Sequence, residues 1–360
     1  ASAFGSVIGG VLFMIEEASS YWNQKLFFRA TFASTVNVIS IVFLLTLVRT
    51  HEGAPSESVL FDRVKFQGMA VFESFDDDEL DYKDRASSAS VLLLTACVGA
   101  FLGCWGAFFN WCQTHVTLVR MRFYKKFTAP WLKVAEVLAV ATLITVANYS
   151  LPLLSGNCRK LTRPTPFGAD AKFTARFQCR RGEYNELASL TMTSLAKSIT
   201  ALFHANSVRT FSLRTLATHF LTTSVFACVT YGLHVPSGLF LPSILMGATF
   251  GRLAGVALVP SLFAKNTRRN LARIVQDMAI AGGVAGLAGT TRMTVSVVAI
   301  FLSTILDGEH VVPIFVAALS SKLAGDLFNE GLYEIHIHLN HYPYMTDAPA
   351  FAHHDSRAVK

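Results

Sequence analysis

The chain has 360 residues, of which 52% are hydrophobic and 15% charged, and its mean hydropathy is +0.43. Soluble globular proteins carry about 25% charged residues, so this composition excludes an ordinary cytosolic enzyme, a disordered chain and a repeat solenoid. It indicates a polytopic membrane protein that lies in a lipid bilayer. The net charge is +7, but the basic residues lie in short loops between apolar runs, as the positive-inside rule predicts. We therefore expect no nucleic-acid partner.

Apolar stretches of unequal length follow one another along the chain. They lie at roughly 4–15, 26–48, 88–119, 134–154, 187–203, 211–233, 238–259, 278–306 and 311–328. A spanning helix needs about 20 apolar residues, so 4–15 and 187–203 are too short to cross a bilayer. Segment 88–119 is longer than a perpendicular helix requires, and we expect it to be steeply tilted.

Two of these segments, 238–259 and 278–306, are interrupted by glycine. The glycines are Gly238, Gly247, Gly251 and Gly255 in the first, and Gly282, Gly283, Gly286 and Gly289 in the second. We expect broken helices in both. Broken backbone is tolerated at membrane depth only where protein buries it or where it lines a cavity, and in transporters such helices mark the substrate site.

The loops orient the predicted helices. Four basic residues follow segment 88–119, namely Arg120, Arg122, Lys125 and Lys126. This connection should be cytoplasmic. The loop at 49–87 is acidic and has no comparable basic cluster, so it should face the opposite side. Segment 134–154 then returns from the cytoplasm and places 155–186 on the non-cytoplasmic side.

Two cysteines, Cys158 and Cys179, lie in the polar loop 155–186. A disulfide persists only in an oxidising compartment, and the basic connection independently places this loop on that side. We predict a Cys158–Cys179 disulfide.

The stretch Tyr231–Ser243 contains two prolines and two glycines around an apolar triplet. A helix interior does not tolerate this composition. We expect an extended loop that enters the membrane and begins a helix near Pro242, because proline is favoured in a first helical turn. Unpaired N–H groups and the positive end of the helix dipole make such a start an anion site without a formal cation. A proline-kinked structural helix is the alternative.

These residues resemble a known family. Gly238–Pro242, which reads Gly-Leu-Phe-Leu-Pro, is similar to the GxFxP anion-binding loop of CLC chloride channels and chloride/proton exchangers. Three further stretches resemble that family in its order: Gly5–Glu17, Gly289–Ser296 and Asp326–Tyr333. The resemblance covers about residues 1–345. Trp22–Gln24 and Gly182–Asn185 are most similar to the late endosomal and lysosomal branch.

The resemblance implies an anion site. In it, the backbone amides of Leu239 and Phe240, in the loop from Gly238 to Pro242, and the hydroxyl of Tyr333 hold the central chloride. From its position alone, Tyr333 would be read as an anchor at the membrane interface.

The pair Glu16–Glu17 is the candidate for proton transfer. Buried carboxylates are costly in a membrane and ordinary at its surface, and neighbours on a helix point about 100° apart, so at most one should face inward. The resemblance implies that Glu17 stands where exchangers carry a proton-relaying glutamate. A solvated pair at a helix end is the alternative.

The implied fold is an all-α polytopic membrane protein, a CLC-type bundle of tilted and broken helices that is mainly the second half of an inverted repeat. Its parts would be the end of the first membrane half (1–48), an acidic non-cytoplasmic loop (49–87), the second membrane half (88–345) and a cytoplasmic tail (346–360). The family's gating glutamate and serine-containing anion loop would precede residue 1. Its nucleotide-binding CBS modules would follow residue 345, so we expect a fragment without a cofactor of its own.

The expected function of the full-length protein is chloride transport coupled to proton antiport across an endosomal, lysosomal or other acidic-organelle membrane, as a homodimer. A passive voltage-gated chloride channel and a non-transporting scaffold are the alternatives. No P-loop and no Gly-x-Ser-x-Gly motif occurs, so we expect no enzyme and no catalytic residue.

Five histidines near the end of the chain raise the question of a metal site. They are His336, His338, His341, His353 and His354. Their spacing fits no tetrahedral pattern and no clustered carboxylate is expected beside them, so we expect a solvated tail and no metal.

Overall fold

The computed structural model describes residues 6–18, 24–51, 89–127, 129–160, 175–205, 208, 210–263, 268–305 and 311–341. The helices are α1 (Val7–Phe13) with the π-helical turn Met14–Ala18, α2 (Gln24–His51), α4 (Ala89–Lys126), α5 (Pro130–Ser155), α6 (Glu186–Thr191), α7 (Leu195–His204), α8 (Leu213–Thr230), α9 (Phe240–Leu262), α10 (Arg268–Thr291), α11 (Val295–Ile305), α12 (Val311–Asp326) and α13 (Leu332–Asn340). Strands β1 (Cys158–Lys160) and β2 (Glu183–Asn185) pair antiparallel. The all-α prediction is confirmed. Most of the predicted acidic loop and the tail from 346 lie outside the described residues.

Local sequence explains where several helices begin. Ser6, Asn185, Ser194 and Ser212 each precede a helix, and each side chain accepts a hydrogen bond from a backbone N–H of the first turn. Such caps satisfy donors that have no partner within the helix. The short helices α1, α6 and α7 are therefore fixed by their caps and their packing rather than by length.

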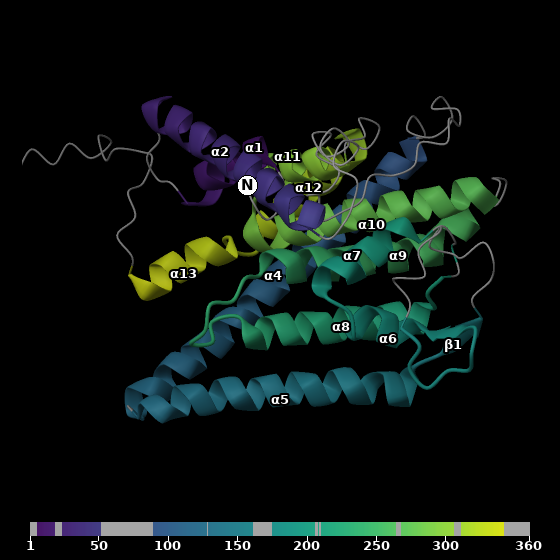
Figure 1. The fold of residues 1–360 in the computed structure, drawn as a ribbon, viewed down its shortest axis with the longest axis horizontal. Helices are drawn as coiled ribbons and strands as arrows, with labels where there is room; N and C mark the ends of the chain where they lie inside the picture. Colours follow the sequence, from purple (N-terminus) through teal and green to yellow (C-terminus); the bar gives the residue numbers. More distant parts are fainter. Residues whose placement is uncertain are drawn as a thin grey trace, which may run out of the picture.

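Helices α9 and α10 pack side by side (Figure 1), and glycines line the seam between them. A Cβ atom at Gly282 would lie 2.5 Å from the carbonyl oxygen of Gly247 and 2.7 Å from the Cα of Gly251. A Cβ atom at Gly286 would lie 2.6 Å from the Cα of Gly247. The prediction of helices broken at these glycines is wrong, because both helices are continuous there and the glycines let two backbones touch.

The break in segment 278–306 comes instead at Arg292. This residue has a φ of 69°, in the left-handed region, and it lies between the end of α10 and the start of α11. A non-glycine residue pays a steric penalty in this conformation, so the surrounding contacts must hold it there.

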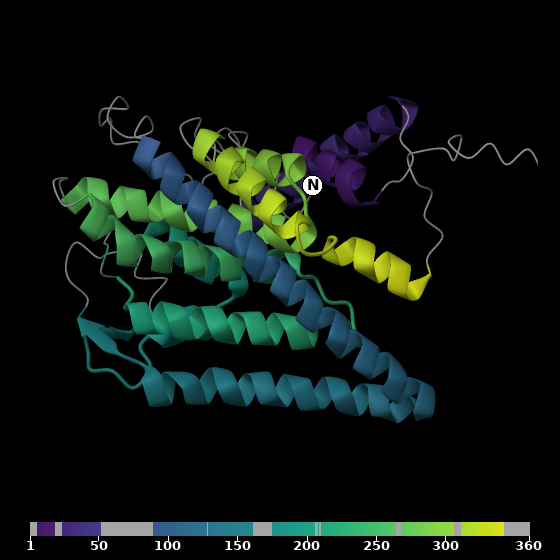
Figure 2. The ribbon, with the colours of Figure 1, turned by 180° about the vertical axis from the view of Figure 1, so that it is seen from behind.

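Helix α4 is 38 residues long and runs obliquely across the molecule (Figure 2). It packs along α12 and α10 and also contacts α8. Four described helices are long and apolar enough to span a membrane, namely α4, α5, α9 and residues Leu271–Thr291 of α10. Helix α5 buries only Pro152, and an apolar helix with such an exposed surface is typical of contact with lipid.

The basic connection after α4 differs from the predicted loop. Helix α4 continues through Lys126, and Arg120 is buried rather than free. Its guanidinium donates to the carbonyl oxygens of Val229 (2.9 Å) and Tyr231 (3.0 Å) at the end of α8, and Nε pairs with Glu136 at 2.6 Å. A cation at a helix C-terminus complements the helix dipole. Arg120 therefore stabilises the end of α8 and fixes the path of the chain that follows it.

Candidate anion and proton site

The start of α9 has no side-chain cap. Leu239 is the N-cap residue and provides no side-chain cap, and the first hydrogen bond of the helix runs from the N–H of Ser243 to the carbonyl of Leu239 at 2.9 Å. The N–H groups before Ser243 therefore have no partner within the helix. The helix begins at Phe240, slightly before the predicted start near Pro242. Proline is tolerated there because an N–H in the first turn has no partner within the helix, so its absence breaks no helical hydrogen bond.

Helix α13 also begins beside this loop without a side-chain cap, after Gly331. Leu332 and Leu239 are both completely buried in one apolar cluster. Tyr333 and Phe240 pack against the same neighbouring core. Two predicted parts of the anion site, the loop before α9 and the tyrosine of α13, therefore adjoin a common core in the structure.

Helix α1 joins the same place through Phe13, whose ring lies edge-on to that of Phe240 with the centroids 6.4 Å apart. Burial raises the pKa of the Tyr333 phenol above its ordinary value, and Tyr231 and Glu17 act in the same direction. Tyr333 therefore stays protonated at neutral pH and keeps an O–H group that can donate to an anion.

The carboxylate of Glu16 binds the start of α11. One carboxylate oxygen accepts hydrogen bonds from the N–H (2.7 Å) and hydroxyl (3.1 Å) of Thr294. The other accepts from the N–H (2.9 Å) and hydroxyl (2.5 Å) of Ser296. Burial acts to raise the pKa of Glu16, but these hydrogen bonds outweigh it and hold the pKa below its ordinary value. Glu16 is thus an ionised cap on α11.

Glu17 has no such partners among the described residues. Burial, followed by the negative charges of Glu16 and Glu334, raises its pKa to about 8, while Lys322 acts against the shift. Both glutamates are half-buried, so burial does not single out one of them as the inward-facing residue. The two carboxyl groups differ in the direction of their pKa shifts, which is downward for Glu16 and upward for Glu17.

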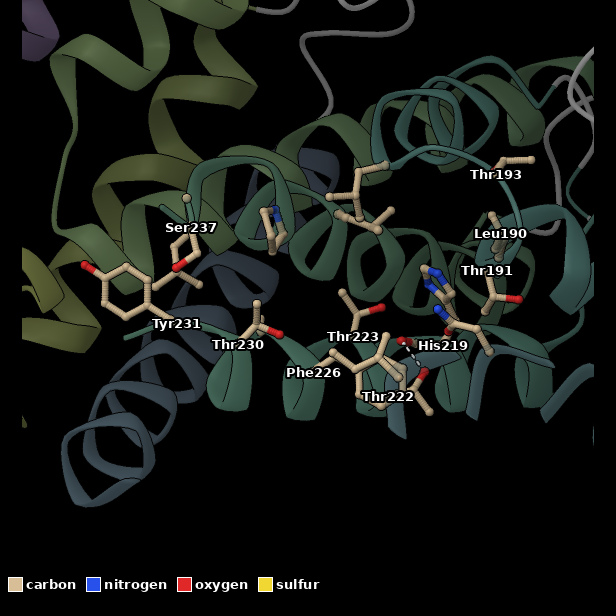
Figure 3. A pocket seen from close by; sticks show the side chains of 18 residues that line it. Leu190, Thr191, Thr193, His219, Thr222, Thr223, Phe226, Thr230, Tyr231 and Ser237 are labelled. Carbon is tan, nitrogen blue, oxygen red and sulfur yellow. Dashed lines mark hydrogen bonds between the residues drawn. The ribbon is translucent and has the colours of Figure 1, made fainter. Parts of the chain in front are cut away.

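A cavity of about 240 Å³ opens beside the loop that precedes α9 (Figure 3). Gly238 and Leu239 line it from the loop and Pro242 from the first turn of α9. Tyr231 and Ser237 also line it and lie close together. The rest of the lining comes mainly from α5, α6 and α8 and includes several threonine hydroxyls. A Cβ atom added at Gly238 would meet no atom within 4 Å, so the space at this glycine is open.

Gly238→Ala is expected to leave the melting temperature unchanged and, if the predicted anion site carries chloride, to lower chloride flux severalfold in the longest form of the protein that contains this chain. The φ of Gly238 lies outside the left-handed region and the added methyl group meets no atom, so the fold tolerates it. The methyl group would occupy the open space beside the loop amides. Thermal unfolding in detergent and chloride efflux from liposomes measure the two effects. Wild-type flux in the variant would contradict a role for this space in anion passage.

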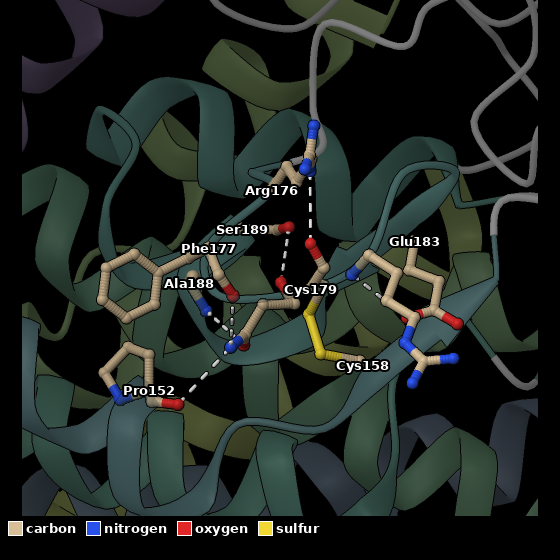
Figure 4. The surroundings of a disulfide bond; sticks show 10 residues. Pro152, Cys158, Arg176, Phe177, Cys179, Glu183, Ala188 and Ser189 are labelled. Atoms are coloured by element: carbon tan, nitrogen blue, oxygen red, sulfur yellow. Dashed lines mark hydrogen bonds between the residues drawn. A yellow bond between two sulfur atoms is a disulfide. The ribbon is translucent and has the colours of Figure 1, made fainter.

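The predicted disulfide is present in the structure and links Cys158 to Cys179 (Figure 4). Cys158 begins β1, which pairs with β2 so that Cys158 faces Asn185. The Asn185 side chain caps α6 and also donates to the carbonyl of Phe177 at 3.3 Å. The disulfide and this asparagine together tie the loop to the start of α6. The loop-closure model gives such a crosslink about 3 kcal/mol of stability.

The predicted solvated tail is wrong for His336. This residue lies on α13 and is half-buried, and its Nε2 donates to Oε1 of Gln113 at 2.8 Å. Its ring also stands edge-on to Tyr231, with centroids 5.1 Å apart. Burial lowers the pKa of His336, so the ring is neutral at pH 7 and links α13 to α4.

The expectation of no carboxylates beside the histidines is also wrong. Glu330, Glu334 and His338 bring their potential ligand atoms within 4.8 Å of one another, and all three are exposed. Exposed acidic clusters are common without a metal, so we assign no metal to them. His353 and His354 lie outside the described residues.

Comparison with known proteins identifies the family. The voltage gated chloride channel family matches residues 1–326. H(+)/Cl(-) exchange transporter 7 of Mus musculus and of Homo sapiens are each 32% identical over 357 residues, which cover 98% of this chain and 40% of each relative. Chloride channel protein CLC-d of Arabidopsis thaliana is 30% identical over 361 residues, covering 98% of this chain and 43% of that protein. The chain therefore spans well under half the length of these relatives.

Two solved structures share the fold. A eukaryotic CLC transporter matches 95% of this chain and 45% of its own, with a TM-score of 0.56 and 23% identity. A slow cyanobacterial Cl-/H+ antiporter matches 94% of this chain and 61% of its own, with the same TM-score and 15% identity. The helical architecture is thus that of CLC proteins. By the family match over most of its length and by its fold, this membrane protein belongs to the voltage gated chloride channel, or CLC, family.

Proposed function

We propose that this chain is the ion-handling part of a chloride/proton exchanger. In this proposal chloride is held by the amides of Leu239 and Phe240 and by the Tyr333 hydroxyl, and Glu17 passes protons. The observation that carries the proposal is that the adjacent Glu16 and Glu17 differ in their hydrogen bonds and in the direction of their pKa shifts. Glu16 is fixed on α11 by four hydrogen bonds, whereas the neighbouring Glu17 has a pKa near 8 and acts electrostatically on Tyr333.

The charges suggest how the two flows are linked. An anion near a carboxylate raises the proton affinity of that carboxylate, and a bound proton removes a negative competitor for the anion site. Backbone dipoles hold an anion without trapping it, as a lysine would. Alternating occupancy of the site by chloride and by a carboxylate then couples chloride to protons.

The names of the relatives support exchange, since two of those reported above are called H(+)/Cl(-) exchange transporters. We further propose a homodimer in the membrane of an acidic organelle, with the disulfide loop on the lumenal side. The Cys158–Cys179 disulfide supports that placement because it requires an oxidising compartment. The chain holds no nucleotide site in this proposal.

Glu17→Gln is expected to abolish proton movement while chloride still flows, because glutamine cannot carry a proton. The experiment uses the longest form of the protein that contains this chain, reconstituted in liposomes. A chloride gradient is imposed and the internal pH is recorded. Glu330→Gln is the matched control, since it neutralises an exposed carboxylate near α13, and it should keep the wild-type ratio of protons to chloride.

A passive chloride channel is the second candidate, supported by the description of the matching family and by relatives named chloride channel proteins. Chloride flux with no pH change in wild type and in Glu17→Gln would favour the channel and contradict exchange. Uphill proton movement in wild type that Glu17→Gln removes would favour the exchanger.

A further inference from the structure

The connection between α10 and α11, with the residues on either side of it, contacts α9, the loop before α13 and Glu16. It contains Arg292, which is 8% exposed and has a left-handed backbone. Thr290, just before Arg292, contacts α9. The Arg292 side chain contacts Asn329 in the loop before α13, and Thr294 and Ser296 bind Glu16.

The Arg292 guanidinium binds several groups at once. It donates to the carbonyl oxygens of Gly289 and Gly325, the second at 2.9 Å, and its Nη2 also lies 2.7 Å from Oδ1 of Asn329. Nε lies 3.2 Å from a carboxylate oxygen of Asp326. A planar fork of donors can satisfy such a set of acceptors, whereas a single ammonium cannot. Arg292 therefore joins the end of α10 to the end of α12.

The loop that Arg292 holds leads directly into α13. Asn329 accepts from Arg292 and also donates to the carbonyl of Ala107 on α4 at 2.7 Å. Asn110, also on α4, donates to the carbonyls of Thr290 (2.9 Å) and Glu330 (3.3 Å). Residues 326–331 thus have few ways to move without breaking these contacts. Their position sets where α13 begins.

On its other side, the connection follows Thr290, which contacts the first turn of α9. The hydroxyl of Thr290 donates to the hydroxyl of Ser243 at 3.2 Å. Ser243 is the residue whose N–H makes the first hydrogen bond of α9, to Leu239. Residues 290–292 therefore connect the first turn of α9 to the start of α13, the two elements that carry the proposed chloride ligands.

We infer that Arg292 is a positioning residue, which holds the Tyr333 hydroxyl at a fixed distance from the amides of Leu239 and Phe240. The inference rests on the proposed function, because it assigns Arg292 to that same anion site. Arg292 itself does not contact the ion. It acts through Tyr333, so removing the guanidinium should change transport only when Tyr333 retains its hydroxyl.

The test compares Arg292→Lys with Tyr333→Ala and with the double variant, all in the longest form of the protein in liposomes. Arg292→Lys keeps the positive charge and removes the planar set of N–H donors. We expect it to keep chloride flux, to lower the protons moved per chloride and to raise the half-saturating chloride concentration, each by about threefold or more, because small misplacements have large effects. The double variant should match Tyr333→Ala alone.

Arg252→Lys is the matched control. Arg252 is also a buried arginine, and it donates to the carbonyls of Leu202 (2.6 Å) and Ala205 (2.9 Å), away from α13. It should keep the wild-type ratio and half-saturation. If Arg292→Lys does not fold, Asn329→Ala removes one acceptor of the same contact and is expected to change both quantities in the same direction.

Wild-type values in Arg292→Lys would overturn the inference. So would a double variant worse than Tyr333→Ala, or an equal loss in Arg252→Lys, because each outcome indicates general damage or no role. If the wild-type protein moves no protons, the proposed exchange fails by itself. Arg292 is then judged by the half-saturating chloride concentration, which a positioned anion site requires in a channel as well.

Discussion

Gly282→Ala is expected to destabilise the protein by on the order of 3 kcal/mol, because the added methyl group has no room in the seam between α9 and α10. The new Cβ would lie 2.5 Å from the carbonyl oxygen of Gly247 and 2.7 Å from the Cα of Gly251. These are backbone atoms of a facing helix, and they cannot turn aside as a side chain does. The strain exceeds the roughly 1 kcal/mol that alanine gains over glycine in a helix.

Gly283→Ala is the control, one residue further along the same helix. Its Cβ would lie 3.3 Å from the tip of the Phe203 ring and 3.4 Å from a methyl group of Ile244, which side-chain motion relieves. Melting temperatures and the monodisperse fraction in detergent should fall clearly for Gly282→Ala and little for Gly283→Ala. Equal effects at both positions would contradict the close approach of the two helices.

Glu16→Ala is expected to cost on the order of 3 kcal/mol, because it leaves the donors of Thr294 and Ser296 at the start of α11 without their ionised acceptor. The pKa of Glu16 is lowered in the folded protein. Its contribution to stability is therefore present above the unfolded-state pKa and is lost as pH falls through the folded-state pKa. Melting temperatures of wild type and variant should converge as the pH is lowered through that range.

Glu17→Gln is the matched control, since it changes the adjacent carboxyl group, whose pKa is shifted in the opposite direction. The pKa of Glu17 is raised to about 8, so its protonated form favours folding below its unfolded-state pKa and this effect is lost as pH rises through the folded-state value. The variant should become more stable than wild type above pH 8. A pH profile of the same sign for both positions would contradict the separate roles of the two glutamates.

Features with a local cause were predicted from the sequence. Gly238 and Pro242 indicated a loop and a helix start, because proline and glycine restrict the backbone wherever they occur. Two cysteines in one polar loop indicated a crosslink. The lengths of the apolar segments indicated the short helix α1 and the long helix α4. Each of these depends on residues close together in the chain.

Features that depend on distant partners were not predicted. Hydropathy does not distinguish a glycine that breaks a helix from one that admits a neighbouring backbone, so Gly282 and Gly247 were misread. Glu16 binds Thr294, 278 residues away, and nothing near Glu16 marks its partner. Arg292 lies between apolar helices, and its role follows only from the carbonyl groups that folding brings around it. His336 was placed in a solvated tail for the same reason.

The uncapped start of α9 has a consequence for how the proposed anion site responds to sequence change. Its donors are main-chain N–H groups, which every amino acid except proline provides. Substitutions at Leu239 or Phe240 therefore alter the walls around the ion and leave the ligands in place. The site is lost when the path of the backbone changes. Its preservation therefore depends on the residues that pack around the loop rather than on the side chains of the residues proposed to contact chloride.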